Sequence, residues 1–354
     1  MTGPPTPVRG REKLASRGGA PIRDTWLPVA LPWIGEREKQ LVLETLDSGW
    51  ITTGPRTHEL GRRIAELAGA RHGLAVNSCT GALHLALAGL GVGPGDEVIT
   101  SPYTFAASVN VIEHVGARPV LADVEPETLC IDPRAIERAL TPRTRAILTV
   151  DYGGQPCDYD AVLAIARPRG LPVVDDAAHA LGASWRGRPI GSLATATAFS
   201  FYAIKNLTTG EGGAVVSDDE GLMERMAMLS LHGMDRDAWK RYTSAGSWFY
   251  EVTAPGFKYN LSDILAAVGL GQLERFAEFQ RRRAELAAGY AERLADLPEV
   301  RLPRARPGAV HAWHLFPIRL RDASRRSRLI EDLKARGIGT GVHFIPVHLH
   351  SFYA

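Results

Sequence analysis

The sequence predicts an α/β protein built on a mostly parallel sheet and followed by a smaller α+β domain. Between residues 60 and 217, strand-like apolar runs alternate with helical segments. Such alternation favours a mostly parallel sheet with helices on both faces. A long helical stretch follows at residues 261–297, and only short strands and one more helix come after it. A chain of 354 residues is long enough to bury a core in each part.

The elements of the first part follow from its apolar runs, which are bounded by Gly, Pro, Asp and Asn. We predict strands at residues 74–77, 97–100, 118–123, 146–150, 172–176, 196–202 and 213–217. We predict helices between several of them, at residues 81–90, 106–115, 133–140 and 160–167. In such a sheet, ligands bind beyond the carboxyl ends of the strands. The polar residues of this chain collect at those ends.

Composition and period also predict the domain boundaries. Residues 1–26 are rich in Pro, Gly and Arg and have no period, so we expect a mobile tail there, or alternatively an arm that docks on a partner subunit. Residues 27–270 form the expected large domain. Residues 271–354 form the expected small domain, with strands at 313–320 and 341–345 and a helix at 325–336. The long helix is expected to break around Gly269 and Gly271.

Composition excludes several classes of function. Lys plus Arg number 41 against 39 Asp plus Glu, so neither nucleic acid nor a membrane is expected as the main partner. The 3 cysteines, Cys79, Cys130 and Cys157, have neither metal-ligand spacing nor a disulfide pattern, and no metal is expected. No apolar run reaches membrane-spanning length, and the N-terminus lacks the apolar core of a signal peptide. We therefore expect a soluble cytoplasmic protein.

Lys205 is the first candidate functional residue. It follows the predicted strand at 196–202 and precedes a Thr- and Gly-rich turn and the strand at 213–217. A single ammonium between two buried strands is costly unless it is paired or used. The alternative is a lysine that extends to solvent from a strand end.

A second candidate lies where the strand at 74–77 meets the helix at 81–90. Small polar residues at this junction, including Thr80, precede an apolar helix. The N-terminus of a helix offers free N–H groups and a positive dipole end, which together bind phosphate. Thr80 and the amide of Gly81 are predicted to do so here. Alternatively, Ser78 or Thr80 is only an N-cap.

A third candidate is the end of the strand at 172–176, where Asp176 is followed three residues later by His179. A carboxylate in this position can keep a heterocyclic nitrogen protonated through a charge-assisted hydrogen bond. The alternative for two adjacent aspartates at a strand end is an ordinary helix cap.

Together these features predict a site for pyridoxal 5′-phosphate (PLP), which needs a phosphate cradle, an acid for its ring nitrogen and a lysine for its aldehyde. Lys205 is predicted to bind the aldehyde as a Schiff base. Asp176 is predicted to keep the pyridinium charged, so that the ring accepts the electron pair released when a Cα proton leaves. Phe105 is predicted to stack on one face of the ring.

The sequence resembles the DegT/DnrJ/StrS family of nucleotide-sugar aminotransferases, which have the aspartate aminotransferase (PLP type I) fold. The resemblance extends from about residue 27 to the last residue. It rests on the motifs SGWITTGP at 48–55, DAAHA at 176–180, SF at 200–201, KN at 205–206, EGG at 211–213 and KYNL at 258–261. Within the family, the sequence is most similar to the branch that aminates UDP-4-keto-arabinose, through residues 50–55, HAWHLF at 311–316 and GIGTGVHF at 337–344.

The resemblance implies roles for individual residues and a glutamate-dependent sugar transamination. Lys205 would be the Schiff-base lysine, Asp176 would contact the ring nitrogen, and His179 would lie by the ring hydroxyl. The resemblance implies that Thr80, Gly81 and Ser200 bind the cofactor phosphate. It also implies that Asn260 contacts the cofactor phosphate of the neighbouring subunit and that His343 lies near the sugar pocket. The role of Asn260 implies a homodimer with shared active sites.

The chain departs from the family pattern in two places, and two other functions are alternatives to sugar transamination. The chain stops at Ala354, where family members usually continue, so we expect either a truncated reading or an incomplete small domain. Cys79 stands where a small Ala or Gly is common. A PLP-dependent sugar dehydratase is one rival, although such relatives carry histidine in place of the lysine. The other rival is a PLP-binding regulatory protein without turnover.

Overall fold

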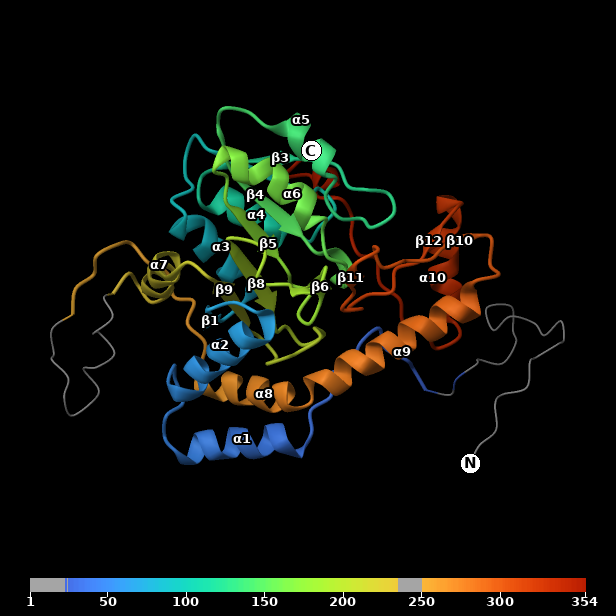
Figure 1. Cartoon of the computed structure of the whole chain (residues 1–354). Coiled ribbons are helices and arrows are strands. Elements are labelled where there is room, and N and C mark those ends of the chain that lie inside the picture. Colours follow the sequence, from blue (N-terminus) through green and yellow to red (C-terminus); the bar gives the residue numbers. More distant parts are fainter. Residues whose placement is uncertain (1–22, 24, 235–249) are drawn as a thin grey trace. The chain divides into compact units, whose positions relative to one another are not determined.

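The structure is a computed structural model that describes residue 23, residues 25–234 and residues 250–354 (Figure 1). Residues 1–22 and 24 of the predicted N-terminal tail lie outside the described residues. The chain divides into two compact units. Within the described residues, the large unit comprises residues 32–234, 250–296, 302–317 and 343–354, and the small unit comprises residues 23, 25–31, 297–301 and 318–342.

A seven-stranded sheet forms the centre of the large unit. Its strands are β1 (His72–Val76), β2 (Glu97–Thr100), β3 (Arg118–Leu121), β4 (Thr144–Val150), β5 (Val173–Asp176), β8 (Ala196–Ser200) and β9 (Gly213–Ser217). Their order is β1-β9-β8-β5-β4-β2-β3. The pairs from β3 through β8 are parallel, whereas β9 runs antiparallel to both β8 and β1. The prediction of a mostly parallel sheet is confirmed.

Helices cover this sheet (Figure 1). The helices of the large unit are α1 (Glu36–Asp47), α2 (Pro55–Ala68), α3 (Cys79–Gly89), α4 (Ala107–His114), α5 (Pro133–Ala139), α6 (Tyr159–Ala166), α7 (Glu220–Ser230), α8 (Asp263–Glu274) and α9 (Phe276–Leu294), of which α1 and α9 contact α8 rather than the sheet. Short strands β6 (Ser184–Trp185), β7 (Arg188–Pro189) and β11 (Ala309–Val310) form a second sheet. No helix within the described part of the chain is long and apolar enough to cross a membrane.

The small unit is built from short elements: β10 (Val300–Arg301), β12 (Arg319–Leu320) and α10 (Arg326–Lys334). The antiparallel pair β10–β12 accounts for only the last two residues of the strand predicted at 313–320. Trp313 has a φ of 47°, and a residue in the left-handed region interrupts an extended run. The prediction of a strand at residues 341–345 is wrong, because the carbonyl of His343 accepts hydrogen bonds from the Tyr103 and Tyr152 hydroxyls instead of a strand partner.

Alternating residues of the strands pack into two apolar cores, one on each face of the main sheet. On β5, Val173 packs in the core that contains residues of α2, α5, α6 and α8. Its neighbour Val174 packs in the core that contains residues of α3, α4 and α7. Because both faces of the sheet are covered, functional groups reach solvent only at the ends of the strands.

The predicted break in the long helix lies elsewhere than expected. Gly269 and Gly271 are inside α8, and the helix ends at Glu274, with Arg275 as its C-cap residue. A Cβ on Gly269 would lie 3.1 Å from Leu60 of α2, and one on Gly271 would lie 2.9 Å from Glu38 of α1. The two glycines therefore allow α1 and α2 to pack closely against α8, and α1 is seen alongside α8 in Figure 1. At the actual break, the Arg275 guanidinium stacks 3.7 Å above the Trp33 ring.

Asp263 joins the start of α8 to the start of α2. Its carboxylate is buried and accepts hydrogen bonds from the N–H groups of Gly54 (2.8 Å), Arg56 (3.1 Å) and Thr57 (2.9 Å) and from the Thr57 hydroxyl (2.7 Å). Gly54 is the N-cap residue of α2 and has no side chain to cap the helix. The distant carboxylate of Asp263 therefore supplies the cap.

Replacing Asp263 with alanine should lower the free energy of unfolding by about 3 kcal/mol, because four donors would lose one buried acceptor group. Urea denaturation measures this loss. Asp219→Ala is a matched control, since Asp219 caps α7 through a single bond to the Leu222 N–H at 2.9 Å and its loss should cost about 1 kcal/mol. Equal losses in the two variants would contradict the role of Asp263 as a shared anchor.

Candidate active site

The predicted site residues lie where the parallel strands end beside the first turn of α3. Asp176 is the last residue of β5 and Ser200 the last residue of β8. Ser200 is opposite Gly213, the first residue of β9. A Cβ on Gly213 would lie 2.5 Å from the Cys79 nitrogen at the start of α3. The absence of a side chain at Gly213 thus lets β9 and α3 come together beside Ser200.

The first turn of α3 has its own cap. Ser78 is the N-cap residue, and its hydroxyl accepts a hydrogen bond from the Gly81 N–H at 2.9 Å. The N-cap alternative is therefore correct for Ser78, and the Gly81 amide has a partner within the chain. The N–H groups of Cys79 and Thr80 have no intrahelical acceptor, because they belong to the first turn. These two amides at the positive end of the helix dipole are suited to an anion such as phosphate.

We expect Gly213→Ala to weaken PLP binding about 10-fold or more, because a methyl group would push backbone atoms of Ser78, Cys79 and Phe199 apart. An absorbance titration of the cofactor-free protein with PLP measures this. Gly93→Ala is the matched control, since its Cβ would meet only the Val115 carbonyl oxygen at 3.9 Å. Unchanged PLP affinity in Gly213→Ala would contradict this arrangement.

Asp176 is buried among donors. The Ser108 hydroxyl donates to its Oδ2 at 2.5 Å, and the Ala178 N–H donates to its Oδ1 at 3.1 Å. Burial raises the pKa of Asp176, whereas the bonds from Ser108 and Ala178 and the charge of Lys205 oppose that rise. The carboxylate is thus held in place and is surrounded by groups that favour its charged form. Sequence reasoning missed Ser108, because nothing in the local pattern distinguishes it from the other polar residues of α4.

Lys205 lies in the turn after β8, and its backbone N–H donates to the Tyr202 carbonyl at 2.9 Å. Burial lowers the pKa of the Lys205 amine, while the nearby Asp176 and Cys79 raise it. A lowered pKa leaves more of the amine neutral, and the neutral amine is the form that attacks an aldehyde. The charge of Asp176 favours the protonated form of the Lys205 amine, and the charge of Lys205 favours the ionised form of Asp176.

His179 lies beside these two residues. The Gly153 N–H donates to its Nδ1 at 3.1 Å, so in the neutral ring the proton is on Nε2. Burial lowers the pKa of His179 well below its usual value, and Lys205 and His343 lower it further. Its ring stacks on that of His314, with 4.5 Å between the centroids. His179 therefore offers a neutral N–H donor at this end of the sheet.

The remaining predicted residues lie around this group. Phe105 has 64% of its surface exposed, and its ring centroid is 6.0 Å from that of Phe344. The half-buried His343 has its pKa lowered by burial and by Lys205. Asn260 forms a bridge with Val76, just before α3, and its Nδ2 donates to the Thr53 hydroxyl at 2.6 Å.

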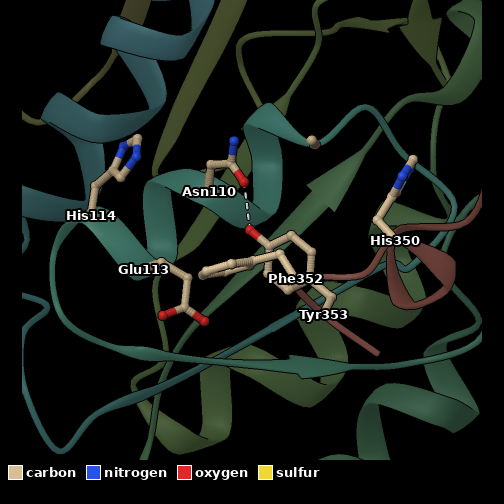
Figure 2. A pocket seen from close by; sticks show the side chains of 7 residues that line it. Asn110, Glu113, His114, His350, Phe352 and Tyr353 are labelled. Atoms are coloured by element: carbon tan, nitrogen blue, oxygen red, sulfur yellow. Dashed lines mark hydrogen bonds between the residues drawn. The ribbon is translucent and has the colours of Figure 1, made fainter.

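A separate cavity of about 460 Å³ contains none of these predicted residues (Figure 2). Its lining includes Asn110, Glu113, His114, His350, Phe352 and Tyr353. The Tyr353 hydroxyl donates to Asn110 Oδ1 at 2.5 Å. Within the described residues, no cluster of three or more His, Cys, Asp and Glu side chains is arranged to hold a metal ion.

The residues at the strand ends fit PLP. Two amides of α3 lack intrahelical acceptors, Gly213 leaves room beside them, and an amine with a lowered pKa lies near a buried carboxylate. These groups match the phosphate, the aldehyde and the ring nitrogen of the cofactor. Together with the mostly parallel sheet, they define a PLP-dependent transferase of fold type I.

The comparison with known proteins identifies the family. Residues 32–354 match the DegT/DnrJ/EryC1/StrS aminotransferase family, and the chain belongs to it. It is 50% identical over 335 residues to the spore coat polysaccharide biosynthesis protein SpsC of Bacillus subtilis, with 94% of this chain and 86% of the relative covered. The protein is a PLP-dependent sugar aminotransferase.

Solved structures with similar folds support the same family assignment. The PLP form of the putative sugar aminotransferase Spr1654 from Streptococcus pneumoniae has a TM-score of 0.87 and 36% identity, covering 93% of this chain and 87% of that one. DesI, solved in the presence of its TDP-sugar product, has a TM-score of 0.85 and 35% identity, covering 96% of this chain and 85% of that one.

Proposed function

We propose that this protein transfers the amino group of glutamate to the keto group of a nucleotide-linked sugar, and that the acceptor is a UDP-linked 4-keto sugar. The observation that carries the proposal is the partly buried Lys205 amine, whose pKa is lowered by burial and raised by the charge of Asp176, the carboxylate at the end of β5. The TDP-sugar product of DesI supports a nucleotide-sugar acceptor. We propose that the amino sugar serves the synthesis of a cell-envelope polysaccharide, lipid or glycoside, and the similarity to the polysaccharide biosynthesis protein SpsC supports the first of these.

The proposed roles follow from the positions of the side chains. Bound PLP withdraws electrons from the Cα of the amino donor, which makes loss of the Cα proton feasible. Lys205 would hold the cofactor through its aldehyde, and its amine would move the Cα proton of the donor as general base and acid. Asp176 would accept a hydrogen bond from the ring nitrogen, His179 would donate one to the ring hydroxyl, and Phe105 would cover one face of the ring.

The proposed phosphate site is formed by Thr80, by Ser200 and by the helix turn that contains Cys79 and Gly81. With the Gly81 amide bonded to Ser78, the N–H groups of Cys79 and Thr80 and the Thr80 hydroxyl are the donors we assign to the phosphate. His343 is proposed to contact the sugar substrate.

Asn260 is proposed to reach the cofactor phosphate of a second copy, so that a homodimer shares its active sites. The three cysteines are free thiols in the structure, which supports our proposal that the protein works in the reducing cytoplasm.

The PLP-loaded protein should convert its cofactor to the pyridoxamine form on addition of glutamate, and should then aminate a keto sugar. Mass spectrometry of a panel of UDP- and dTDP-linked keto sugars would identify the acceptor. A product that has lost water without gaining an amino group would favour the dehydratase instead. A cofactor unchanged by glutamate, aspartate and alanine would favour the PLP-binding protein without turnover. The similarity to the aminotransferase family and to the putative sugar aminotransferase Spr1654 favours transamination.

A further inference from the structure

His314 connects two parts of the site, although none of the assigned roles includes it. Its ring stacks on His179, with centroids 4.5 Å apart and planes inclined by 29°. Its Nδ1 lies 3.1 Å from Oδ1 of Asn206, the residue that follows Lys205. Asn206 is buried, with 6% of its surface exposed. One imidazole thus contacts both the turn that carries the reactive lysine and the histidine proposed to lie by the cofactor ring.

The hydrogen bonds of Asn206 determine which nitrogen of His314 carries the proton. Asn206 Nδ2 donates to the Ala312 carbonyl at 2.8 Å and to Gln280 Oε1 at 3.0 Å. A backbone carbonyl can only accept, so the orientation of the Asn206 amide is fixed. Its Oδ1 therefore faces His314, and since an amide oxygen can only accept, His314 Nδ1 must carry a proton.

The two stacked histidines thus have opposite tautomers. The Gly153 N–H places the proton of His179 on Nε2, whereas Asn206 places that of His314 on Nδ1. Burial lowers the pKa of both rings well below the usual value. The charged and titratable groups that act on His314 are His179, Lys205, Arg283 and His343, and each of them also lowers its pKa. Both rings are therefore neutral at neutral pH.

We propose that His314 is a positioning residue for the transamination at Lys205: its Nδ1–H fixes Asn206 and the lysine turn, and its ring holds the Nε2–H tautomer of His179 toward the cofactor. The inference rests on the proposed function. His314 acts through its two neighbours and is assigned no contact with the substrate. Losing its N–H would leave the buried Asn206 oxygen without a donor, next to the residue whose amine must be aligned.

The tautomers can be measured without any sugar substrate. In protein labelled with ¹⁵N-histidine, long-range ¹H–¹⁵N spectra show which ring nitrogen of each histidine carries the proton. We expect a protonated Nδ1 in His314 and a protonated Nε2 in His179, in both the cofactor-free and the PLP-loaded protein. The same tautomer in both rings, or a charged ring at neutral pH, would overturn the proposal.

Two substitutions separate the hydrogen bond from the ring stack. His314→Phe keeps a ring against His179 but removes the donor, so kcat should fall about 5- to 100-fold while KM for glutamate changes little. His314→Asn keeps a donor at the position of Nδ1, and kcat should return to within about 5-fold of the wild type. PLP attachment to Lys205, followed by absorbance, should slow in the phenylalanine variant and recover in the asparagine variant.

His311→Phe is the matched control. His311 is also buried, and its Nδ1 accepts the Trp313 N–H at 2.8 Å, but burial alone lowers its pKa, to about 3, with no contribution from Lys205. This variant should lose stability with wild-type kcat and PLP attachment. If His311→Phe and His314→Phe impair PLP attachment equally, or if His314→Asn gives no recovery, His314 has only a structural role. If the wild type aminates no sugar, the proposed function is rejected. The tautomers of the two histidines and the rate of PLP attachment would still decide whether His314 positions the lysine turn.

Discussion

Lys205→Ala should abolish sugar transamination, with a loss in kcat of about 10⁴-fold or more. In the proposed mechanism, the variant would lose both the attachment of the cofactor aldehyde and the amine that moves the Cα proton. The surroundings of Lys205 make this amine suitable for both roles, because burial lowers its pKa while Asp176 keeps a carboxylate nearby. The measurements are the absorbance of the lysine-bound cofactor, which should disappear, and the glutamate half-reaction, which should stop.

Two further variants test whether the effect depends on the amine itself. Lys205→Arg keeps a positive charge near Asp176 but cannot attach the aldehyde, so it should be as inactive as Lys205→Ala. Lys334→Ala removes an exposed lysine at the end of α10 and should leave both measurements unchanged. An arginine variant with substantial activity would show that charge is sufficient, and would refute covalent attachment at this position.

The grouping of Lys205 with Asp176 could be predicted from the sequence because it follows from topology. Both residues come after buried apolar runs, and the ends of parallel strands meet at one edge of a sheet. Ser108 and His314 could not be predicted in this way. Ser108 reaches Asp176 from a helix 68 residues earlier in the chain, and His314 meets Asn206 from 108 residues away. No local pattern marks such contacts.

The fold shows the same division between local and distant causes. Strands buried on both faces have continuous apolar runs, so most of the main sheet could be predicted from the sequence. The glycines of α8 were misread as a helix break, because their role is to allow close packing by Glu38 and Leu60, which are distant in the sequence. The prediction of a strand at 341–345 was wrong because the hydroxyls of Tyr103 and Tyr152, rather than a neighbouring strand, donate to the His343 carbonyl.

Asp176→Asn should lower kcat about 10²- to 10⁴-fold, because an amide cannot balance the charge of a protonated ring nitrogen. The fold should persist, since an asparagine Oδ1 can still accept from Ser108 or from the Ala178 N–H. The pH dependence of the bound cofactor's absorbance should change as well, because the ring nitrogen would lose its proton at a lower pH. Single-turnover kinetics with glutamate measure the effect on the chemical step.

Asp175→Asn is the control that tests whether the effect depends on the carboxyl group at position 176 rather than on any carboxyl group at this strand end. Asp175 precedes Asp176 on β5 and is equally buried, and its Oδ1 accepts from the Thr149 hydroxyl at 3.1 Å. Burial, with the nearby carboxyl of Asp151, raises the pKa of Asp175 well above its usual value, so this side chain carries a charge less readily than a free aspartate. Activity within about 3-fold of the wild type is expected, because Asp175 is assigned no contact with the cofactor. Comparable losses in the Asp175 and Asp176 variants would mean that the strand end tolerates no substitution, and the specific role of Asp176 toward the ring nitrogen would then be refuted.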